Sequence, residues 1–130
     1  MPLGRNTINP KYPNTTKPKY LSLPQNMSTK RLEQLKGLLE ESPHDSFLIF
    51  ALAKEYEKLE ELETALRHYL HLEEHDPDYV GTYYHLGKLY ERMEETGLAF
   101  QTYEKGIEVT RRAGDQHAMG ELAAAKMALE

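Results

Sequence analysis

Apolar side chains along this chain recur at helical spacing, and the same spacing returns 34 residues later. The first set is Ile49, Leu52, Ala53 and Tyr56. The second set, one period on, is Tyr83, Leu86, Gly87 and Tyr90. Each set falls at i, i+3, i+4 and i+7, which places its members on one face of a helix. The pattern therefore predicts two equivalent amphipathic helices whose small residue, Ala53 or Gly87, lets another helix come close.

A second helix is predicted after each of these two, again in the same register. It carries Ala and Tyr one helical turn apart, at Ala65 and Tyr69 in the first copy and at Ala99 and Tyr103 in the second. A fixed period of this length, with two helices in each period, is typical of a helical repeat. One helix pair cannot cover its own apolar face, so such repeats stack into arrays. The two complete repeats are predicted at residues 46–79 and 80–113.

The order of these side chains resembles the tetratricopeptide repeat family. A small residue follows Leu, Tyr comes three residues later, and Ala and Tyr occupy the second helix. Pro77 closes the first repeat where the family usually has proline, whereas Arg111 takes that place in the second. The resemblance covers about residues 28–129 and is closest to small bacterial-type proteins with one such domain. It implies an all-α fold, a right-handed superhelical stack of antiparallel helix pairs with about six helices.

The pattern continues before the first complete repeat. One period before Tyr69 stands Leu35, so residues 28–41 are expected to form the second helix of a repeat whose first helix is missing. Ser28 is a candidate N-cap for this helix. Arg31 stands where the repeat has Ala, which suits a terminal helix with no preceding partner.

The pattern also continues after the second repeat. Residues 115–129 are expected to form a capping helix, because Ala has the highest helix propensity and this stretch is rich in it. Strict repeat phase would put Gly120 at a packing position, so a shift of two residues is preferred, with Met119, Leu122 and Ala123 at the contact. The preceding helix then runs through Arg111, and Gly114 stops it. Turns are expected at about residues 42–45, 60–62, 76–79, 94–96 and 113–115.

Charge divides the chain into two parts. Residues 1–27 hold four basic and no acidic residues and five of the seven prolines. The other 12 of the 16 basic residues lie in 28–130, together with all 21 acidic residues. A proline-rich, basic segment with few aliphatic residues cannot bury enough apolar surface to fold alone. We therefore expect an extended or disordered tail at 1–27 and a helical domain at 28–130.

Catalytic and metal chemistry find little support in the sequence. The chain has no cysteine, and we see no glycine-rich phosphate loop and no order of residues that suggests a catalytic triad. The stretch His71–His75 matches the H-x-x-E-H zinc-protease pattern. These imidazoles fall off the face that carries Tyr69, however, and a catalytic zinc needs a closed, oriented site. The sequence is thus expected to be non-enzymatic, with no metal site, no catalytic residue and no cofactor.

A binding surface is the remaining expectation. In the family that the chain resembles, the first helices of successive repeats line a concave groove that takes a peptide. The corresponding face repeats its chemistry after 34 residues, as aromatic, Lys, Glu and basic. The candidate groove residues are Phe47, Phe50, Lys54, Glu57, Lys58, Tyr84, His85, Lys88, Glu91 and Arg92. Such a face suits a peptide with carboxylates and an apolar anchor.

Two alternatives stay open. The lysines and glutamates of this face could pair with one another on a solvated helix surface, since such neighbours interact. The chain could also be a self-assembling scaffold, a homo-oligomer formed through its end helices or its N-terminal tail, because arrays usually need about three repeats to cover their ends. The expected partners are proteins or peptides, with no nucleic acid and no membrane. No stretch is apolar enough to span a bilayer, and a cytoplasmic adaptor is the simplest interpretation.

Overall fold

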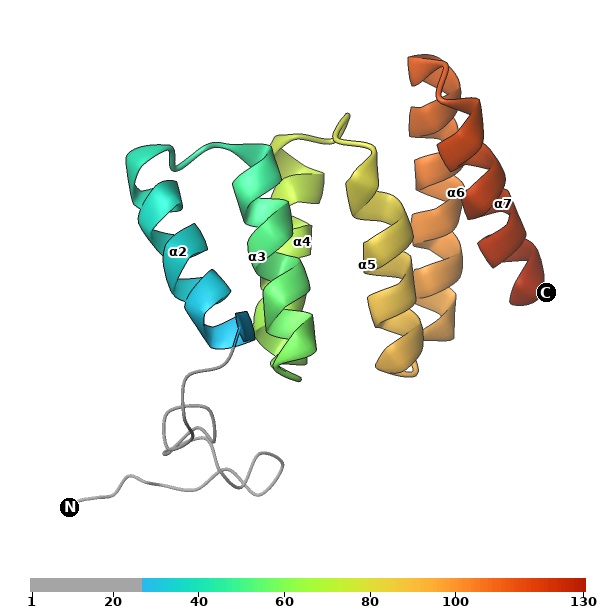
Figure 1. Ribbon diagram of the computed structural model, residues 1–130. Helices are drawn as coiled ribbons and strands as arrows, with labels where there is room; N and C mark the ends of the chain where they lie inside the picture. Colours follow the sequence, from blue (N-terminus) through green and yellow to red (C-terminus); the bar gives the residue numbers. More distant parts are fainter. Residues whose placement is uncertain (1–26) are drawn as a thin grey trace.

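The computed structural model describes residues 27–130, which form six helices joined by short turns (Figure 1). They are α2 (Met27–Glu41), α3 (Ser46–Lys58), α4 (Leu62–His75), α5 (Gly81–Arg92), α6 (Thr96–Ala113) and α7 (Gln116–Ala128). No strand occurs in this part of the chain. The all-α arrangement and the positions of the turns agree with the sequence-based expectation to within about two residues. The expected tail at 1–27 lies almost entirely outside the described residues.

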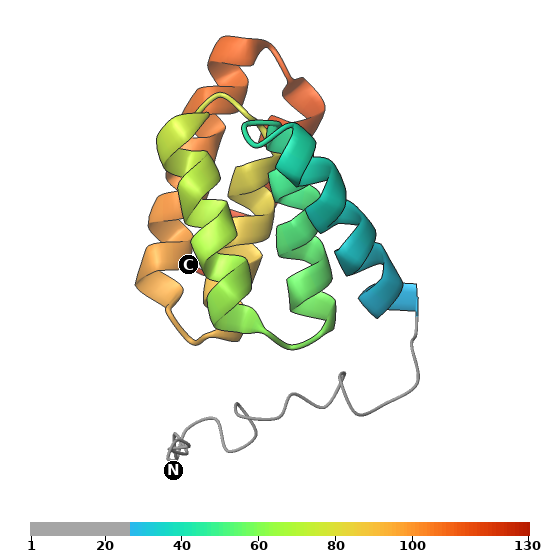
Figure 2. The same cartoon turned by 90° about the vertical axis from the view of Figure 1, so that its left-hand side faces the viewer.

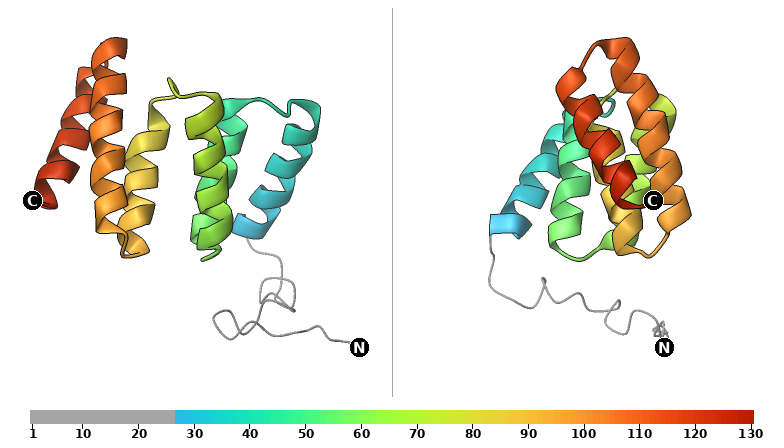
Figure 3. Two further views of the ribbon diagram at one scale, coloured as in Figure 1. Left: turned by 180° about the vertical axis from the view of Figure 1, so that it is seen from behind. Right: turned by 90° about the vertical axis from the view of Figure 1, so that its right-hand side faces the viewer.

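The two complete repeats form two layers. α3 and α5 lie on one side of the stack, and α4 and α6 lie on the other (Figures 2 and 3). Within each pair the helices are joined by three residues, and the middle one, Glu60 or Glu94, has φ of 62°. The amide of the next residue, Glu61 or Glu95, donates to the carbonyl of Tyr56 or Tyr90. The same turn is therefore built twice, 34 residues apart.

Three tyrosines fill the core of the stack. Tyr69, Tyr83 and Tyr103 are fully buried. A Cβ atom added at Gly87 would lie 2.7 Å from Cδ1 of Tyr103, so the α5 backbone rests directly on this ring. Gly106 is equally tight, since a Cβ atom there would lie 2.5 Å from Cβ of Tyr83. The small residues at both positions are thus required by helix–helix contact, as the repeat pattern predicted for Gly87.

The N-terminal helix packs on one side of α3. Leu32 and Leu35 of α2 join Leu48, Ala51 and Leu52 of α3 in one apolar cluster. Seen along the stack, α3 lies between α2 and α4 (Figures 2 and 3). The helix begins at Met27, so Ser28 lies within it. The side chain of Ser28 is not among those described, so its role as an N-cap stays a prediction.

The C-terminal end follows the shifted register only in part. α6 runs through Ala113 and ends at Gly114, which has φ of 74°, as expected. In α7, Leu122 is buried and Met119 half-buried, whereas Ala123 is exposed. The prediction for Ala123 was wrong, because the helix turns Ala125 rather than Ala123 toward α6 and α5. Among residues 27–130, no helix combines the length and the apolar content of a membrane span.

Candidate functional site

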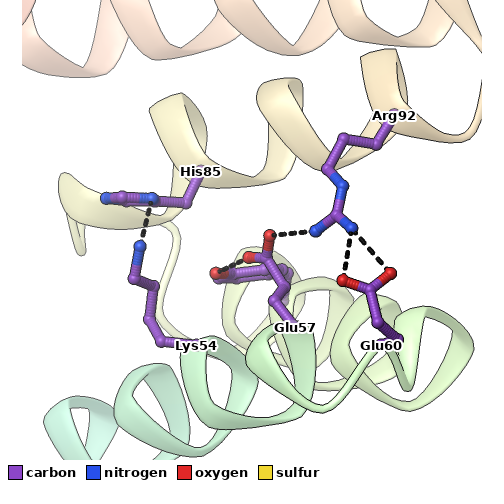
Figure 4. Close-up of polar contacts among 6 residues, drawn as sticks. Lys54, Glu57, Glu60, His85 and Arg92 are labelled. Carbon is purple, nitrogen blue, oxygen red and sulfur yellow. Dashed lines mark hydrogen bonds and ion pairs between the residues drawn. The ribbon is translucent and has the colours of Figure 1, made fainter.

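The two sets of candidate groove residues meet at His85. The Lys54 ammonium of α3 donates to Nδ1 of His85 of α5 at 3.1 Å (Figure 4). The ring of Phe50 stands edge-on to the same imidazole, with centroids 5.2 Å apart. The Tyr84 ring also stands edge-on to the imidazole of His85, with ring centroids 5.5 Å apart. The Lys88 ammonium lies 5.6 Å from the centre of the Tyr84 ring. The two copies of the aromatic–lysine pattern therefore form one continuous surface across α3 and α5.

His85 is neutral at this contact. Burial, and to a smaller extent the positive charge of Lys54, lowers the pKa of its imidazole to about 4. The unprotonated ring nitrogen of a neutral imidazole can accept a hydrogen bond from the Lys54 ammonium, and this contact brings no opposite charge to the lysine. The Lys54 ammonium thus lies on a face that also carries aromatic rings.

The two glutamates of the candidate groove have a structural partner that the sequence analysis missed. The buried hydroxyl of Tyr69 donates to Glu57 at 2.5 Å, and the hydroxyl of Tyr103 donates to Glu91. Burial and the adjacent carboxylate raise the pKa of both tyrosines far above the ordinary value. The signal was available, because each Glu precedes its Tyr by 12 residues in both repeats. These carboxylates tie the first helix of a repeat to the second.

Most of the remaining charges of this face also have internal partners. Arg92 pairs across repeats with Glu57 at 3.5 Å and Glu60 at 2.9 Å (Figure 4). Lys88 pairs with Glu91 at 3.7 Å within α5. Pairing between neighbours on one helix, the first alternative left open by the sequence, therefore describes Lys88 and Lys58, whereas Arg92 pairs across the two repeats. Among residues 27–130, no carboxylate lies within ion-pair distance of Lys54.

A hollow of about 520 Å³ lies between α2 and α3. Its α2 wall is Lys30, Arg31 and Gln34, and its α3 wall is Phe47, Phe50, Ala51, Lys54, Glu55 and Lys58. Four of these side chains are cationic and one is acidic. Phe47 is 60% exposed at the rim. The structure thus brings four of the ten candidate groove residues into a basic, aromatic hollow and adds three residues of α2 that the sequence analysis had not assigned to a site.

Glu55 lies at the base of this hollow. Its side chain is only 3% exposed and accepts from Nε of Arg31 at 3.0 Å and from Lys58 at 3.3 Å. Within the described residues its second oxygen, Oε1, has no hydrogen-bond donor. The position one period later is Leu89, which is fully buried. Arg31, which replaces the expected Ala, therefore provides the partner for a buried acid.

The H-x-x-E-H stretch lies in α4. The rings of His71 and His75 stack with centroids 4.2 Å apart, and Nδ1 of His75 lies 3.0 Å from the His71 carbonyl. Nδ1 of His68 lies 2.8 Å from the Thr64 carbonyl. In residues 27–130 no group of three potential ligands is arranged to hold a metal ion.

Comparison with known proteins connects this geometry to a family. The tetratricopeptide repeat pattern matches residues 80–112. The chain is 51% identical to the solution structure of a tetratricopeptide repeat domain protein from Salinibacter ruber, over 68% of this chain and 89% of that one, with a TM-score of 0.66. A crystal structure of such a protein from the same organism is 50% identical over 66% of this chain and 96% of that one, with a TM-score of 0.64.

A more distant structure shares the same arrangement. The solution structure of a protein from Bordetella parapertussis is 27% identical, covers 82% of this chain and 89% of its own, and has a TM-score of 0.67. No curated protein matches the sequence. The repeated packing and the identity to the Salinibacter ruber proteins show that this chain belongs to the tetratricopeptide repeat family.

Proposed function

We propose that this chain is an adaptor that binds an acidic segment of a partner protein on the face formed by α3 and α5. Tetratricopeptide repeats generally mediate protein–protein interactions, and the proposal adds the location and the chemistry. The observation that carries it is the contact of Lys54 and Phe50 with His85, which joins the two copies of the pattern. Aromatic side chains provide apolar contact area, and lysines select carboxylates.

The charges of the face favour an acidic ligand even though residues 28–130 are acidic overall. Lys54 is held by a neutral imidazole, so its charge is not cancelled locally. Lys88 lies against the Tyr84 ring and at 3.7 Å from Glu91, which is an ion pair too long to fix its position. The Lys88 ammonium can therefore turn toward a carboxylate at little cost, because exposed pairs contribute little to stability. The Lys54 ammonium can donate to a carboxylate while it contacts His85, since an ammonium has three N–H donors.

Charge reversal tests this proposal directly. The probe is a capped, fluorescein-labelled peptide of alternating Glu and Phe, and its binding is measured by fluorescence anisotropy. Lys54→Glu together with Lys88→Glu is expected to weaken binding by at least about tenfold, or 1.4 kcal/mol. Binding to the unchanged chain is expected to weaken as salt rises, because exposed charges are screened within a Debye length of about 10 Å at 0.1 M.

A matched control separates this effect from net charge. Lys36→Glu together with Arg67→Glu makes the same change of charge on exposed residues of α2 and α4. This control is expected to retain binding, and circular dichroism should give the same helix content for all variants. Equal binding by the Lys54 and Lys88 double variant and the unchanged chain would reject the proposal.

A second candidate function is assembly of the chain with copies of itself. Ala53 and Gly87 are buried beneath a second helix, whereas Ala123 of α7 is exposed and Met127 beside it is 68% exposed. Exposed apolar surface at the end of a stack favours contact with another copy. Light scattering after size exclusion tests this candidate. It predicts a dimer or larger species that Met127→Lys converts to monomer.

A further inference from the structure

The α3 wall of the hollow has an internal counterpart in the second repeat. The six α3 residues of that wall correspond, 34 positions later, to Gly81, Tyr84, His85, Lys88, Leu89 and Arg92 of α5. On α5 three residues of this face contact another helix, α3, or the Glu57 side chain that it carries. The Phe50 ring lies 3.5 Å from the Cβ position of Gly81, His85 contacts Lys54, and Arg92 contacts Glu57. The hollow is thus the place where a helix preceding α3 would contact it.

The helix α2 covers this face only in part. It buries Ala51 and Glu55 but leaves Phe47 at the rim 60% exposed. The Arg92 guanidinium holds two carboxylates of the preceding helix and its turn, whereas its counterpart Lys58 holds only Glu55, in its own helix. On α5 the equivalent face contacts a preceding helix. On α3 this face is therefore partly open, at the N-terminal end of the stack.

We infer that the hollow between α2 and α3 binds an acidic amphipathic helix of a partner protein. The inference follows from the correspondence with α5 and from the positive charge of the hollow. The inference rests on the proposed function and names the shape of the partner segment and the end of the face that anchors it. The helix places a large apolar side chain against Phe47 and Phe50, as α3 places Phe50 against α5. Its carboxylates meet Lys30, Lys54 and Lys58, three of the four cations of the hollow.

Charge complementarity selects this occupant over the chain's own N-terminal segment. Residues 1–26 contain Arg5, Lys11, Lys17 and Lys19 and no acidic residue, so their charge has the same sign as the hollow. The five prolines of that segment also oppose a helix. A partner segment rich in Glu has the opposite charge and high helix propensity.

The experiment uses the full chain and three labelled peptides of about 16 residues, long enough to be partly helical in water. The first is rich in Ala, with Phe and Leu on one helical face and Glu beside them. The second has Lys in place of Glu, and the third has a central Pro. Only the first is expected to bind with high affinity in anisotropy measurements. Equal binding of the Pro peptide would overturn the helical part of the inference, and equal binding of the Lys peptide would overturn its charge.

Substitutions on α2 locate the site, because α2 does not belong to the α3–α5 face. Lys30→Glu together with Gln34→Glu makes the α2 wall acidic at two exposed positions. This double variant is expected to bind the acidic peptide about tenfold more weakly, or weaker still. The control, Lys36→Glu with Gln101→Glu, makes the same charge change at exposed positions outside the hollow and is expected to bind normally.

The remaining outcomes distinguish this inference from the proposed function. Loss of binding in Lys88→Glu but not in the Lys30 and Gln34 variant would overturn the inference and leave the α3–α5 face standing. Loss in neither would overturn both. Light scattering that shows a dimer in the absence of peptide, converted to monomer by the Lys30 and Gln34 variant, would assign the hollow to a second copy and also overturn the inference.

Discussion

At the scale of single residues, the small side chains of the repeat determine how closely its helices approach. Gly87→Leu is expected to destabilise the chain by about 1–3 kcal/mol or more, because the new side chain would overlap the buried Tyr103 ring. Helix propensity alone predicts the opposite sign, since Gly is poor in helices. Urea unfolding followed by circular dichroism measures the change.

Gly37→Ala is the matched control for this substitution. Gly37 also lies inside a helix, but no atom stands within 4 Å of its Cβ position. The free energy of unfolding is expected to rise by about 0.5–1 kcal/mol. Equal or raised stability of Gly87→Leu would show that the α5–α6 contact is not tight.

Glu55 is the residue that the sequence could not explain. Its counterpart Leu89 is fully buried, yet Glu55 is buried as well, between Arg31 and Lys58. Removing Arg31 leaves the buried Glu55 with Lys58 as its remaining ion-pair partner, whereas replacing the acid with an apolar residue removes the cost of burying it. Arg31→Ala is therefore expected to lower the free energy of unfolding by about 1–3 kcal/mol, and Glu55→Leu to leave it unchanged or raise it. A larger loss in Glu55→Leu than in Arg31→Ala would contradict this account.

His85 makes stability depend on pH below its ordinary pKa of 6.5. Burial lowers its pKa to about 4 in the folded chain, so between these values only the unfolded chain takes up the proton. The free energy of unfolding therefore falls as pH drops from 6.5 to 4, by about 1–2 kcal/mol after allowance for the part of the ring that remains in water. His85→Gln is expected to reduce the loss of stability between pH 7 and pH 4.5 by this amount. The exposed control His44→Gln should leave the loss as it is.

At the scale of helices and turns, the structure shows a strained residue at the same place in both repeats. Glu60 and Glu94 adopt φ of 62°, a conformation that glycine reaches more easily than other residues. Glu94→Gly is expected to raise the free energy of unfolding by about 0.5–1 kcal/mol, because the relief of strain exceeds the added entropy of the unfolded chain.

The neighbouring residue supplies the control. Glu95 has φ of −106°, so Glu95→Gly relieves no strain and is expected to reduce stability slightly. Thermal unfolding of the two variants compares them. A higher melting temperature for Glu95→Gly than for Glu94→Gly would show that the turn is not strained.

The helices of the central repeats and those at the two ends differ in how far the sequence determines them. The helices of the two complete repeats followed from spacing, since a period of 34 fixes which positions are buried in both copies. The C-terminal helix departs from the period of 34, so nothing in the sequence fixed its register and the orientation of Ala123 was not predictable. In the candidate site the aromatic and lysine positions were predicted, whereas the α2 wall of the hollow depends on how two helices pack.

At the scale of the whole molecule, the stack has contacts mainly between neighbouring helices. A substitution at one end should therefore destabilise mainly the helices at that end. In repeat proteins stability is approximately a sum of units and their interfaces. Leu122 of α7 is 1% exposed and packs in the cluster that includes Tyr83, Tyr103 and Val109. The cluster of α2 and α3 is separate and shares none of these residues. In residues 27–130 the two ends of the stack are thus joined mainly through α4 and α5.

Leu122→Ala tests whether the ends are independent. Removing this buried side chain is expected to cost about 2–4 kcal/mol, through lost burial and the cavity left behind. Hydrogen exchange should then rise strongly in α6 and α7 and much less in α2 and α3, because opening at the C-terminal end leaves the Leu32 cluster intact. Leu38→Ala, at a 52% exposed leucine of α2, is the control and should change exchange little in either half. A uniform rise over all six helices after Leu122→Ala would show that the stack unfolds as one unit.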